Sequence, residues 1–527
     1  MSAQTLTAPA ERPREIVSYD PGTGAEIGRA PLFSPEEVQA AVNVARRAQP
    51  AWASLSYEQR GRIIVQARKL MLAERDELAL LISKETGKPV AEAVSMEIVP
   101  TLDTMHYFAN YAAHLLRPQP IDIGQYGLMG RSSRIVFRPL GVIGIISPWN
   151  FPLATPADEV VMALMAGNAV VLKPSELTPL IAVKLGDIFK RAGLPAGLLN
   201  IVTGDGSTGG ALVDARVDKI MFTGSVATGK RVAEAAARHL TPVVLELGGK
   251  DPMIVLEDAN IENAARGAVW GAFANSGQAC ASVERCYVQE SIAPKFIEQV
   301  VAETHALKQG LGTQIGIDVG AMSNEHQLQI VADHVHDAKQ RGAEILTGGQ
   351  RASNLDGLFY EPTVLTNVNH DMAIMRDETF GPVLPVMTFK TEADAVKLAN
   401  DSIFGLTASV WTKDIAKGKR LAEQIDAGTV MVNEVVYTHG IAQTPWGGVK
   451  DSGYGRTHGR MGLLELVHPQ HIHVNRLSFL PDLWWFRYSP RAGKLFSGLA
   501  NNFTTGSILK TSLLLPQMIR RLFGSRE

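Results

Sequence analysis

The sequence is poor in cysteine: its 527 residues include only Cys280 and Cys286. Such a pair cannot form a disulfide framework, and no second pair at a suitable spacing completes a zinc site, so we expect a reducing compartment and no bound metal. The chain also lacks a basic excess, since its net charge is −2, and this argues against a nucleic-acid partner. No stretch reaches the roughly 18 apolar residues of a membrane-spanning helix. The N-terminus has no basic start followed by an apolar core, which argues against a secretory signal.

The residues that are present describe a globular protein, with 46% apolar and 20% charged side chains. A chain of this length is too long for one core and should divide into two or three domains. Helical and strand patterns alternate along most of it, which is typical of α/β proteins with parallel sheets. A capping box at Ser34 and Glu37 begins the first expected helix. Further helices are expected over 57–86, with a break near Ala73, and over 91–116.

Short and almost wholly apolar stretches indicate buried parallel strands at 141–152 and 168–179, joined by a helix over 153–168. Strands over 198–204 and 219–225 should follow, and a second series of strands and helices begins after the stretch 243–259 and runs to about Pro445.

The tail over residues 477–527 differs from the rest of the chain in charge. It has seven basic residues against two acidic ones, a local balance of +5; the basic residues are Arg487, Arg491, Lys494, Lys510, Arg520, Arg521 and Arg526, and the acids are Asp482 and Glu527. Aromatic and aliphatic residues lie among the basic ones, which suits contact with an anionic membrane surface. Packing over a neighbouring subunit, or over the mouth of the protein's own substrate tunnel, is the alternative.

Cys280 lies in the stretch FANSGQACAS, among small and polar residues such as Gly277, Gln278 and Ser282. A buried structural thiol is one interpretation. The other is a nucleophile, which needs a carboxylate and N–H donors as helpers. Glu246 is a single acid inside an apolar strand, and Asn150 ends another strand, so both are candidates. Cys286 keeps the structural interpretation.

Together these pieces resemble the aldehyde dehydrogenase superfamily over roughly residues 15–475. The matching stretches occur in the family's order: SPWNFP, GNAVVLKPSELTP, FTGSVATG, LELGGKDPMIV, FANSGQAC, ETFGPVLPV and PWGGVKDSGYGR. The resemblance implies that Cys280 attacks an aldehyde, that Asn150 and the Cys280 N–H hold the oxyanion, and that Glu246 activates water to hydrolyse the thioester. The presence of Glu246 argues against transfer of the acyl group to coenzyme A.

The resemblance also implies a nicotinamide cofactor bound without a G-x-G-x-x-G loop. Lys173 and Glu176 would bind the adenine ribose, and Glu378 and Phe380 the nicotinamide ribose and ring. The other residues assigned to the cofactor are Ser147, Pro148, Trp149, Gly224, Ser225, Gly229 and Leu247. Because a carboxylate repels a 2′-phosphate, Glu176 favours NAD, while Lys173 leaves NADP open.

Some positions depart from the family's pattern. Thr457 stands where many members have a glutamate and Arg460 where another acid is common, which puts a proton-relay role of this region in doubt. The expected tunnel residues are Thr155, Asp158, Ser282, Tyr437 and His439. No arginine pair indicates a carboxylate-bearing substrate, so aliphatic, aromatic and semialdehyde substrates all stay open.

The expected architecture is α/β, with a doubly wound nucleotide-binding domain over 1–118 and 140–246 and a catalytic domain over 247–445. A β-hairpin oligomerisation flap takes 119–139 and 446–476, ahead of the tail, and its open edges favour a homodimer or homotetramer. We expect a cytoplasmic enzyme, with association at the membrane surface left open. A semialdehyde dehydrogenase of the same mechanism and a non-catalytic dinucleotide-binding protein are the alternatives.

Overall fold

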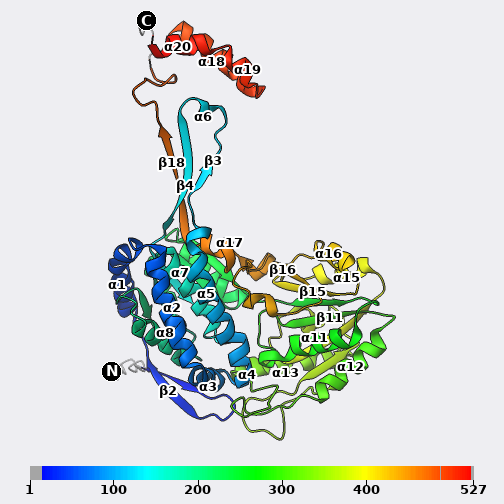
Figure 1. The fold of residues 1–527 in the computed structure, drawn as a ribbon. Helices are drawn as coiled ribbons and strands as arrows, with labels where there is room; N and C mark the ends of the chain where they lie inside the picture. Colours follow the sequence, from blue (N-terminus) through cyan, green and yellow to red (C-terminus); the bar gives the residue numbers. More distant parts are fainter. Residues whose placement is uncertain (1–14, 487, 524–527) are drawn as a thin grey trace, which may run out of the picture. The chain divides into compact units, whose positions relative to one another are not determined.

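The computed structural model describes residues 15–486 and 488–523. The first fourteen residues of the expected nucleotide-binding domain, and Arg487, Arg526 and Glu527 of the tail, lie outside the described residues. The chain forms two compact units (Figure 1): one runs to Leu116 and resumes over Pro139–His468, and the other comprises Arg117–Arg138 with the chain from Pro469 onward.

A six-stranded sheet organises the first half of the larger unit, and its strand order is β7-β6-β5-β8-β9 with β17 at the β9 edge. The first five strands are parallel, whereas β17 pairs antiparallel with β9. This order confirms the predicted doubly wound sheet, and the strands match the apolar stretches of the sequence. The strands are β5 (Val142–Ile146), β6 (Ala169–Lys173), β7 (Leu199–Ile201), β8 (Lys219–Thr223), β9 (Val243–Glu246) and β17 (Gly453–Tyr454).

Helices in two groups pack on this sheet: α7 and α8 with α2 over them, and α9 and α10 with α1. Ser34 and Glu37 form the predicted capping box of α1, and the predicted break near Ala73 is confirmed because α2 ends there and α3 begins at Arg75. The helices are α1 (Pro35–Ala53), α2 (Tyr57–Ala73), α3 (Arg75–Thr86), α7 (Ala154–Ala166), α8 (Pro179–Arg191), α9 (Gly206–Asp214) and α10 (Val226–Ala237). Strands β1 (Glu15–Tyr19) and β2 (Glu26–Pro31) form a separate antiparallel pair.

The helix expected over 91–116 is not uniform. A short α4 (Val90–Glu92) leads into π-helical turns over Ala93–Ile98, and α5 follows over Val99–Leu115. Pro100 has no N–H and its ring would clash with the preceding turn, and the wider π turn relieves this clash. Residues of these turns line the cavity described below.

A seven-stranded sheet forms the second half of the larger unit, in the order β12-β13-β14-β11-β10-β15-β16. Two apolar clusters pack around this sheet, one including Val331 and the other including Phe273. Cys286 lies in the second cluster with none of its surface exposed. The strands are β10 (Asp251–Val255), β11 (Val283–Gln289), β12 (Glu344–Thr347), β13 (Thr363–Thr366), β14 (Val383–Phe389), β15 (Thr407–Trp411) and β16 (Thr429–Val432). The helices are α11 (Ile261–Phe273), α12 (Ala293–His305), α13 (Glu325–Gln340), α14 (Ala373–Arg376), α15 (Glu392–Asn400), α16 (Ile415–Ala422) and α17 (Gly459–Leu464), with 3-10 turns at Ala274–Gly277, Tyr437–Gly440 and Lys450–Ser452.

The smaller unit joins residues 119–138 and 469–476 of the expected flap to the tail, whereas residues 446–468 belong to the larger unit. Its sheet has the order β18-β4-β3, and its helical part has a small core of Leu483, Leu495, Leu499 and Met518, against which Met129 of the flap packs. Arg131 of β4 forms an ion pair with Asp482. The elements are β3 (Gln119–Ile121), α6 (Gln125–Leu128), β4 (Arg131–Pro139), β18 (Val467–Asn475), α18 (Pro490–Thr504), α19 (Ile508–Ser512) and α20 (Leu515–Phe523). Within the described parts of the chain, no helix combines the length and apolarity that crossing a bilayer requires.

Candidate active site

The six-stranded sheet reverses its strand order between β5 and β8, and in doubly wound sheets ligands bind at this point, beyond the carboxyl ends of the strands. Ser147 follows β5, and Thr223 ends β8. The hydroxyl oxygens of both residues are buried and have no hydrogen-bond partner among the described residues. Buried hydroxyls are normally paired, so this crevice fits the polar backbone of a dinucleotide.

Other predicted cofactor residues surround the same crevice. Lys173 ends β6, and its Nζ lies 3.1 Å from an oxygen of Glu176. Ser225 caps α10, where backbone N–H groups favour a phosphate. Gly229 lies in the first turn of α10 but supports the site by packing, because a Cβ there would lie 2.5 Å from Leu247.

A cavity of about 720 Å³ extends from this crevice to Cys280. Asn150, Glu246 and Cys280 line it together, although 130 positions separate Asn150 from Cys280 in the chain. The predicted cofactor residues that also line it are Pro148, Trp149, Gly224, Ser225, Leu247, Glu378 and Phe380. The rings of Trp149 and Phe380 meet edge to face with centroids 5.4 Å apart. The structure thus brings the predicted thiol, amide and carboxylate together in the wall of one cavity.

The backbone before Cys280 has an unusual conformation. Asn275, Ser276 and Gly277 all have positive φ, at 53°, 55° and 71°. A Cβ at Gly277 would lie 2.0 Å from the Gly381 carbonyl oxygen, so glycine is required there. Strained backbone of this kind is common at functional sites, and here it carries the chain from α11 to a partly exposed Cys280.

Asn150 is held by contacts that the sequence did not reveal. Its side-chain amide donates to the Gln278 carbonyl at 3.0 Å, which leaves the second amide hydrogen for another acceptor. Its own carbonyl accepts from Lys88 Nζ at 2.7 Å. Lys88 is fully buried and forms an ion pair with Glu97 at 2.6 Å, and Glu97 also accepts from the N–H groups of Leu153 and Ala154.

The two glycines of the LELGG stretch let the catalytic elements approach closely. A Cβ at Gly248 would lie 2.4 Å from Glu378, and one at Gly249 would lie 2.4 Å from the Cys280 carbonyl oxygen. Gly249 N–H donates to Glu378 at 2.9 Å. Burial, with the neighbouring charge of Glu284, raises the pKa of Glu378 to about 8.

Glu246 ends β9 and is 6% exposed. Burial raises its pKa to about 7, while the positive charges of His458 and Arg456 oppose this shift. A carboxyl with a pKa near neutrality is suited to general-base work. Burial also raises the pKa of the Cys280 thiol, as do the charges of Glu246 and Asp251, so this thiol needs a proton acceptor to react.

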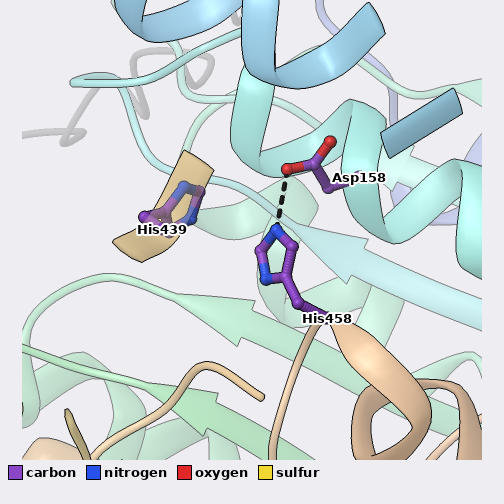
Figure 2. Close-up of side chains that lie close together, drawn as sticks. All are labelled: Asp158, His439 and His458. Atoms are coloured by element: carbon purple, nitrogen blue, oxygen red, sulfur yellow. Dashed lines mark hydrogen bonds and ion pairs between the residues drawn. The ribbon is translucent and has the colours of Figure 1, made fainter. Parts of the chain in front are cut away.

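A hydrogen-bonded chain leads away from Glu246. Thr457 Oγ1 lies 3.4 Å from Glu246 Oε1 and 3.0 Å from His458 Nδ1, and His458 Nε2 lies 2.9 Å from Asp158 Oδ2. Figure 2 shows this last contact, with the His439 ring beside it. The ring centroids of His439 and His458 are 4.9 Å apart, and metal-binding atoms of Asp158, His439 and His458 all lie within 4.8 Å of one another.

The expected tunnel residues and Arg460 do not all lie at the cavity. Thr155, Asp158, Tyr437 and His439 line the cavity as predicted. Ser282 is buried and its hydroxyl donates to the Gly271 carbonyl at 3.0 Å. Arg460 is exposed and donates to the Leu115 carbonyl.

Glu159, which the sequence reasoning passed over, lies in the cavity wall with both carboxyl oxygens buried and unpartnered among the described residues. Its pKa is well above the usual range because of burial and the charges of Glu246 and Asp158. Two adjacent acids in the apolar helix PADEVVMAL were the signal available in the sequence.

A doubly wound sheet and a thiol that share one cavity fit a nicotinamide-dependent oxidoreductase. Comparison with known proteins specifies the class. The aldehyde dehydrogenase family model matches residues 8–472. A 4,4'-diapolycopene aldehyde oxidase of a Methylomonas species is 42% identical over 483 residues, covering 92% of this chain and 90% of that protein. A Mycobacterium ulcerans protein, provisionally named succinate-semialdehyde dehydrogenase [NADP(+)] 2, is 39% identical over 470 residues, covering 88% and 90%.

Among solved structures, the NAD-dependent aldehyde dehydrogenase of Sinorhizobium meliloti superposes with a TM-score of 0.85 at 38% identity, covering 92% of this chain and 95% of that chain. The chain therefore belongs to the aldehyde dehydrogenase family, and it oxidises aldehydes with NAD or NADP.

Proposed function

We propose that this enzyme oxidises an uncharged, apolar aldehyde to the carboxylic acid, with Cys280, Asn150 and Glu246 in the roles predicted above. The observation that carries the choice of substrate is the charge of the cavity. Among the described residues that line it there is no lysine or arginine, but there are five acids: Asp103, Asp158, Glu159, Glu246 and Glu378. A carboxylate-bearing substrate would find no lysine or arginine there to offset its desolvation.

The acylation half-reaction uses the thiol wall. Cys280 loses its proton to a base, and the sulfur attacks the carbonyl carbon of the aldehyde to form a thiohemiacetal oxyanion. The free hydrogen of the Asn150 amide is the side-chain donor for that oxyanion. The Lys88–Glu97 ion pair fixes the backbone of Asn150, so the donor is oriented before the substrate arrives.

Bound NAD or NADP supplies the hydride acceptor of this reaction. Ser147 and Thr223 would hold the dinucleotide at the crevice, Ser225 at the N-terminus of α10 would face its phosphates, and Glu378 would bind its nicotinamide ribose. Glu176 favours NAD, because its carboxylate beside the ribose disfavours a 2′-phosphate.

The deacylation half-reaction uses Glu246. Its carboxylate takes a proton from water, the resulting hydroxide adds to the thioester carbon, and the Cys280 thiolate leaves as the acid forms. Because the pKa of Glu246 is about 7, the group is ionised in a large fraction of molecules at neutral pH and still basic enough to accept a proton.

Apolar side chains in the cavity wall also support an apolar substrate. Its apolar members come from the π-helical turns, α5, α11 and the segment after β16; they are Met96, Val99, Pro100, Trp270, Val436 and Tyr437. The relative from Methylomonas is named for a diapolycopene aldehyde, a substrate of this apolar kind. Succinate semialdehyde, for which the mycobacterial relative is named, is the second candidate.

The smaller unit supports a place at the membrane surface. Exposed apolar side chains lie on its helical part beside exposed basic ones: Trp485, Phe486, Leu509 and Leu513 with Arg491, Lys494, Lys510 and Arg520. This pairing fits an anionic lipid surface, on which a cytoplasmic enzyme would reach a lipophilic aldehyde. The β18 edge, nine residues long and mostly exposed, fits strand pairing in a homodimer or homotetramer.

A panel of aldehydes tests the proposal, with reduced cofactor as the readout and with NAD and NADP in parallel. We expect kcat/KM for a long-chain aldehyde to exceed that for succinate semialdehyde by about 10²-fold, and NAD to be preferred. Betaine aldehyde, which is cationic, is the control for attraction to the acids. A preference for succinate semialdehyde or betaine aldehyde would contradict the proposed substrate class, and no oxidation of any aldehyde would contradict the mechanism.

A further inference from the structure

Two histidines and an aspartate meet in the wall of the cavity, and the reaction proposed above does not use them. Asp158 lies on α7, His439 in the 3-10 turn Tyr437–Gly440, and His458 directly before α17 (Figure 2). All three side chains line the cavity. Each offers one nitrogen or carboxylate oxygen, and these three atoms all lie within 4.8 Å of one another. Segments far apart in the chain thus bring two imidazoles and one carboxylate to one place.

We propose that Asp158, His439 and His458 bind one divalent transition-metal ion, for which Zn²⁺ is the probe. Imidazole is a favoured ligand of zinc, copper, iron and nickel ions, whereas Mg²⁺ and Ca²⁺ favour oxygen ligands. Two imidazoles, one carboxylate and a fourth position for water are a ligand set of catalytic zinc sites. Because the three side chains line the cavity, that fourth position is open to a ligand oxygen in the cavity. Metal binding of this kind goes beyond aldehyde oxidation and is independent of the roles proposed for Cys280 and Glu246.

The hydrogen bonds of this cluster leave metal-binding atoms available. Among the described residues, none forms a hydrogen bond with the His439 ring, which instead contacts the rings of Trp446 and His458, both at 4.9 Å between centroids. Asp158 is 1% exposed, and its Oδ1 is buried with no hydrogen-bond partner in the described part of the chain. Buried polar atoms are normally paired. The single contact between His458 and Asp158 therefore does not account for the whole cluster.

The contacts of His458 suit a metal ligand. Its Nε2 lies 2.9 Å from Asp158 Oδ2, and its Nδ1 lies 3.0 Å from Thr457 Oγ1. With Nε2 bound to the ion, the neutral ring carries its proton on Nδ1 and donates it to Thr457, whose hydroxyl in turn faces Glu246 at 3.4 Å. Histidines that bind a metal almost always donate their other N–H to a partner, which fixes the orientation of the ring.

The distances require only a small adjustment on binding. Ligand atoms that lie about 2.0–2.1 Å from a tetrahedral Zn²⁺ are roughly 3.3 Å from one another. The distance of 2.9 Å between His458 Nε2 and Asp158 Oδ2 is already close to this value. The separations of up to 4.8 Å in the full set have to shorten by at most roughly 1.5 Å. His439 can supply this movement, because no hydrogen bond to another described residue holds its ring.

The charge of the cavity also favours a cation. The described residues that line it include five acids and neither lysine nor arginine. Two of these acids accompany Asp158 at the cluster: Glu159 follows it on α7, and Glu246 is linked to His458 through Thr457. A cleft lined by charges of one sign concentrates ions of the opposite sign. The expectation of no bound metal rested on the two cysteines alone, and the histidine cluster departs from it.

Zinc binding to full-length C280A tests the proposal, because removal of the thiol excludes it as a competing zinc ligand. We expect calorimetry to show one Zn²⁺ per chain, with affinity at least about 10²-fold lower when H439Q or D158N is added to C280A. T457V removes only the partner of His458 Nδ1, so its effect should be smaller, about 10-fold. Zn²⁺ should also raise the melting temperature of C280A but not of C280A/H439Q, while equal melting temperatures without zinc show that both proteins are folded.

H326Q, added to C280A, is the matched control: His326 lines the same cavity outside the cluster, so zinc affinity should stay unchanged. The exposed His471 and His473 of β18 form a competing surface site. Zinc that binds equally well with and without H439Q, or that is lost on H471Q instead, would overturn the proposal, as would a C280A protein that binds no zinc. A wild type that oxidises no aldehyde would contradict the proposed function and leave the zinc result unchanged.

Discussion

The cavity of the larger unit and the helical part of the smaller unit break the usual rule of burial in opposite directions. In the cavity wall and in the crevice beyond β5, polar groups are buried without partners among the described residues: Glu159 and Thr223 line the cavity, and Ser147 follows β5. In the smaller unit, apolar side chains are exposed: Phe486 by 78% and Leu509 by 77%. A buried polar group and an exposed apolar patch are the two informative departures in a folded protein.

The contrast agrees with the different ligands proposed for the two regions. Buried hydroxyls and carboxyls gain free energy from a polar, reacting ligand that pairs with them, and they cost free energy otherwise. Exposed aromatic and aliphatic groups among basic ones gain free energy from contact with an apolar, anionic surface. The proposed functions therefore assign chemistry to the first region and location to the second, and a substitution in one region should leave the function proposed for the other unchanged.

The largest effect is expected at the thiol. C280A should lower aldehyde oxidation by about 10⁴-fold, because the nucleophile is lost, while NAD binding measured by calorimetry stays within about twofold of wild type. C286A is the matched control: it removes the other, fully buried thiol and should leave kcat/KM nearly unchanged at some cost in thermal stability. Oxidation by C280A within tenfold of wild type would contradict covalent catalysis.

A smaller loss is expected at the base. E246Q should keep the burst of reduced cofactor but slow steady-state turnover by about 10²- to 10⁴-fold, so that the acyl adduct accumulates on the protein and is visible by intact mass. In the wild type, kcat should rise as pH increases through about 7, because only the ionised carboxyl accepts a proton, and this rise should vanish in E246Q. Unimpaired turnover of E246Q would remove Glu246 from the mechanism.

The smallest effect is expected in the smaller unit. Replacing the exposed Lys494 and Arg520 by glutamine should weaken flotation with anionic liposomes at low salt by roughly 30-fold, at about 1 kcal/mol for each charge, and leave kcat/KM for a soluble aldehyde unchanged. Arg521 is not suited to this test, because it donates to the carbonyls of Leu483 and Trp485 and supports the fold. Wild-type protein that does not float would contradict membrane contact, and altered oligomer size would favour subunit packing.

Local patterns in the sequence predicted what local physics decides. Apolar runs predicted strands β5 and β6, and the capping residue Ser34 predicted where α1 begins. Family resemblance grouped Cys280, Asn150 and Glu246, and the structure does place them in one cavity.

The partners that the sequence did not reveal are distant in the chain. His458 meets Asp158 across 300 positions, and no periodicity reports such a contact. Glu159 looked like an ordinary helix residue, since only the packing of α7 shows that its carboxyl is buried. The sequence does not reveal that the flap and the tail share a core, because Met129 packs against the cluster of Leu483, Leu495, Leu499 and Met518 only once the whole chain has folded.

The scarcity of cysteine has a consequence for oxidative damage. An oxidant that enters the cavity meets one thiol, Cys280, because the other cysteine is sealed inside the seven-stranded sheet with none of its surface exposed. A sulfenic acid formed on Cys280 thus has no resolving thiol within the folded chain and cannot be stored as an internal disulfide. Reduction of this sulfenic acid depends on a small thiol that diffuses in from solution. Further oxidation to the sulfinic acid inactivates the site irreversibly.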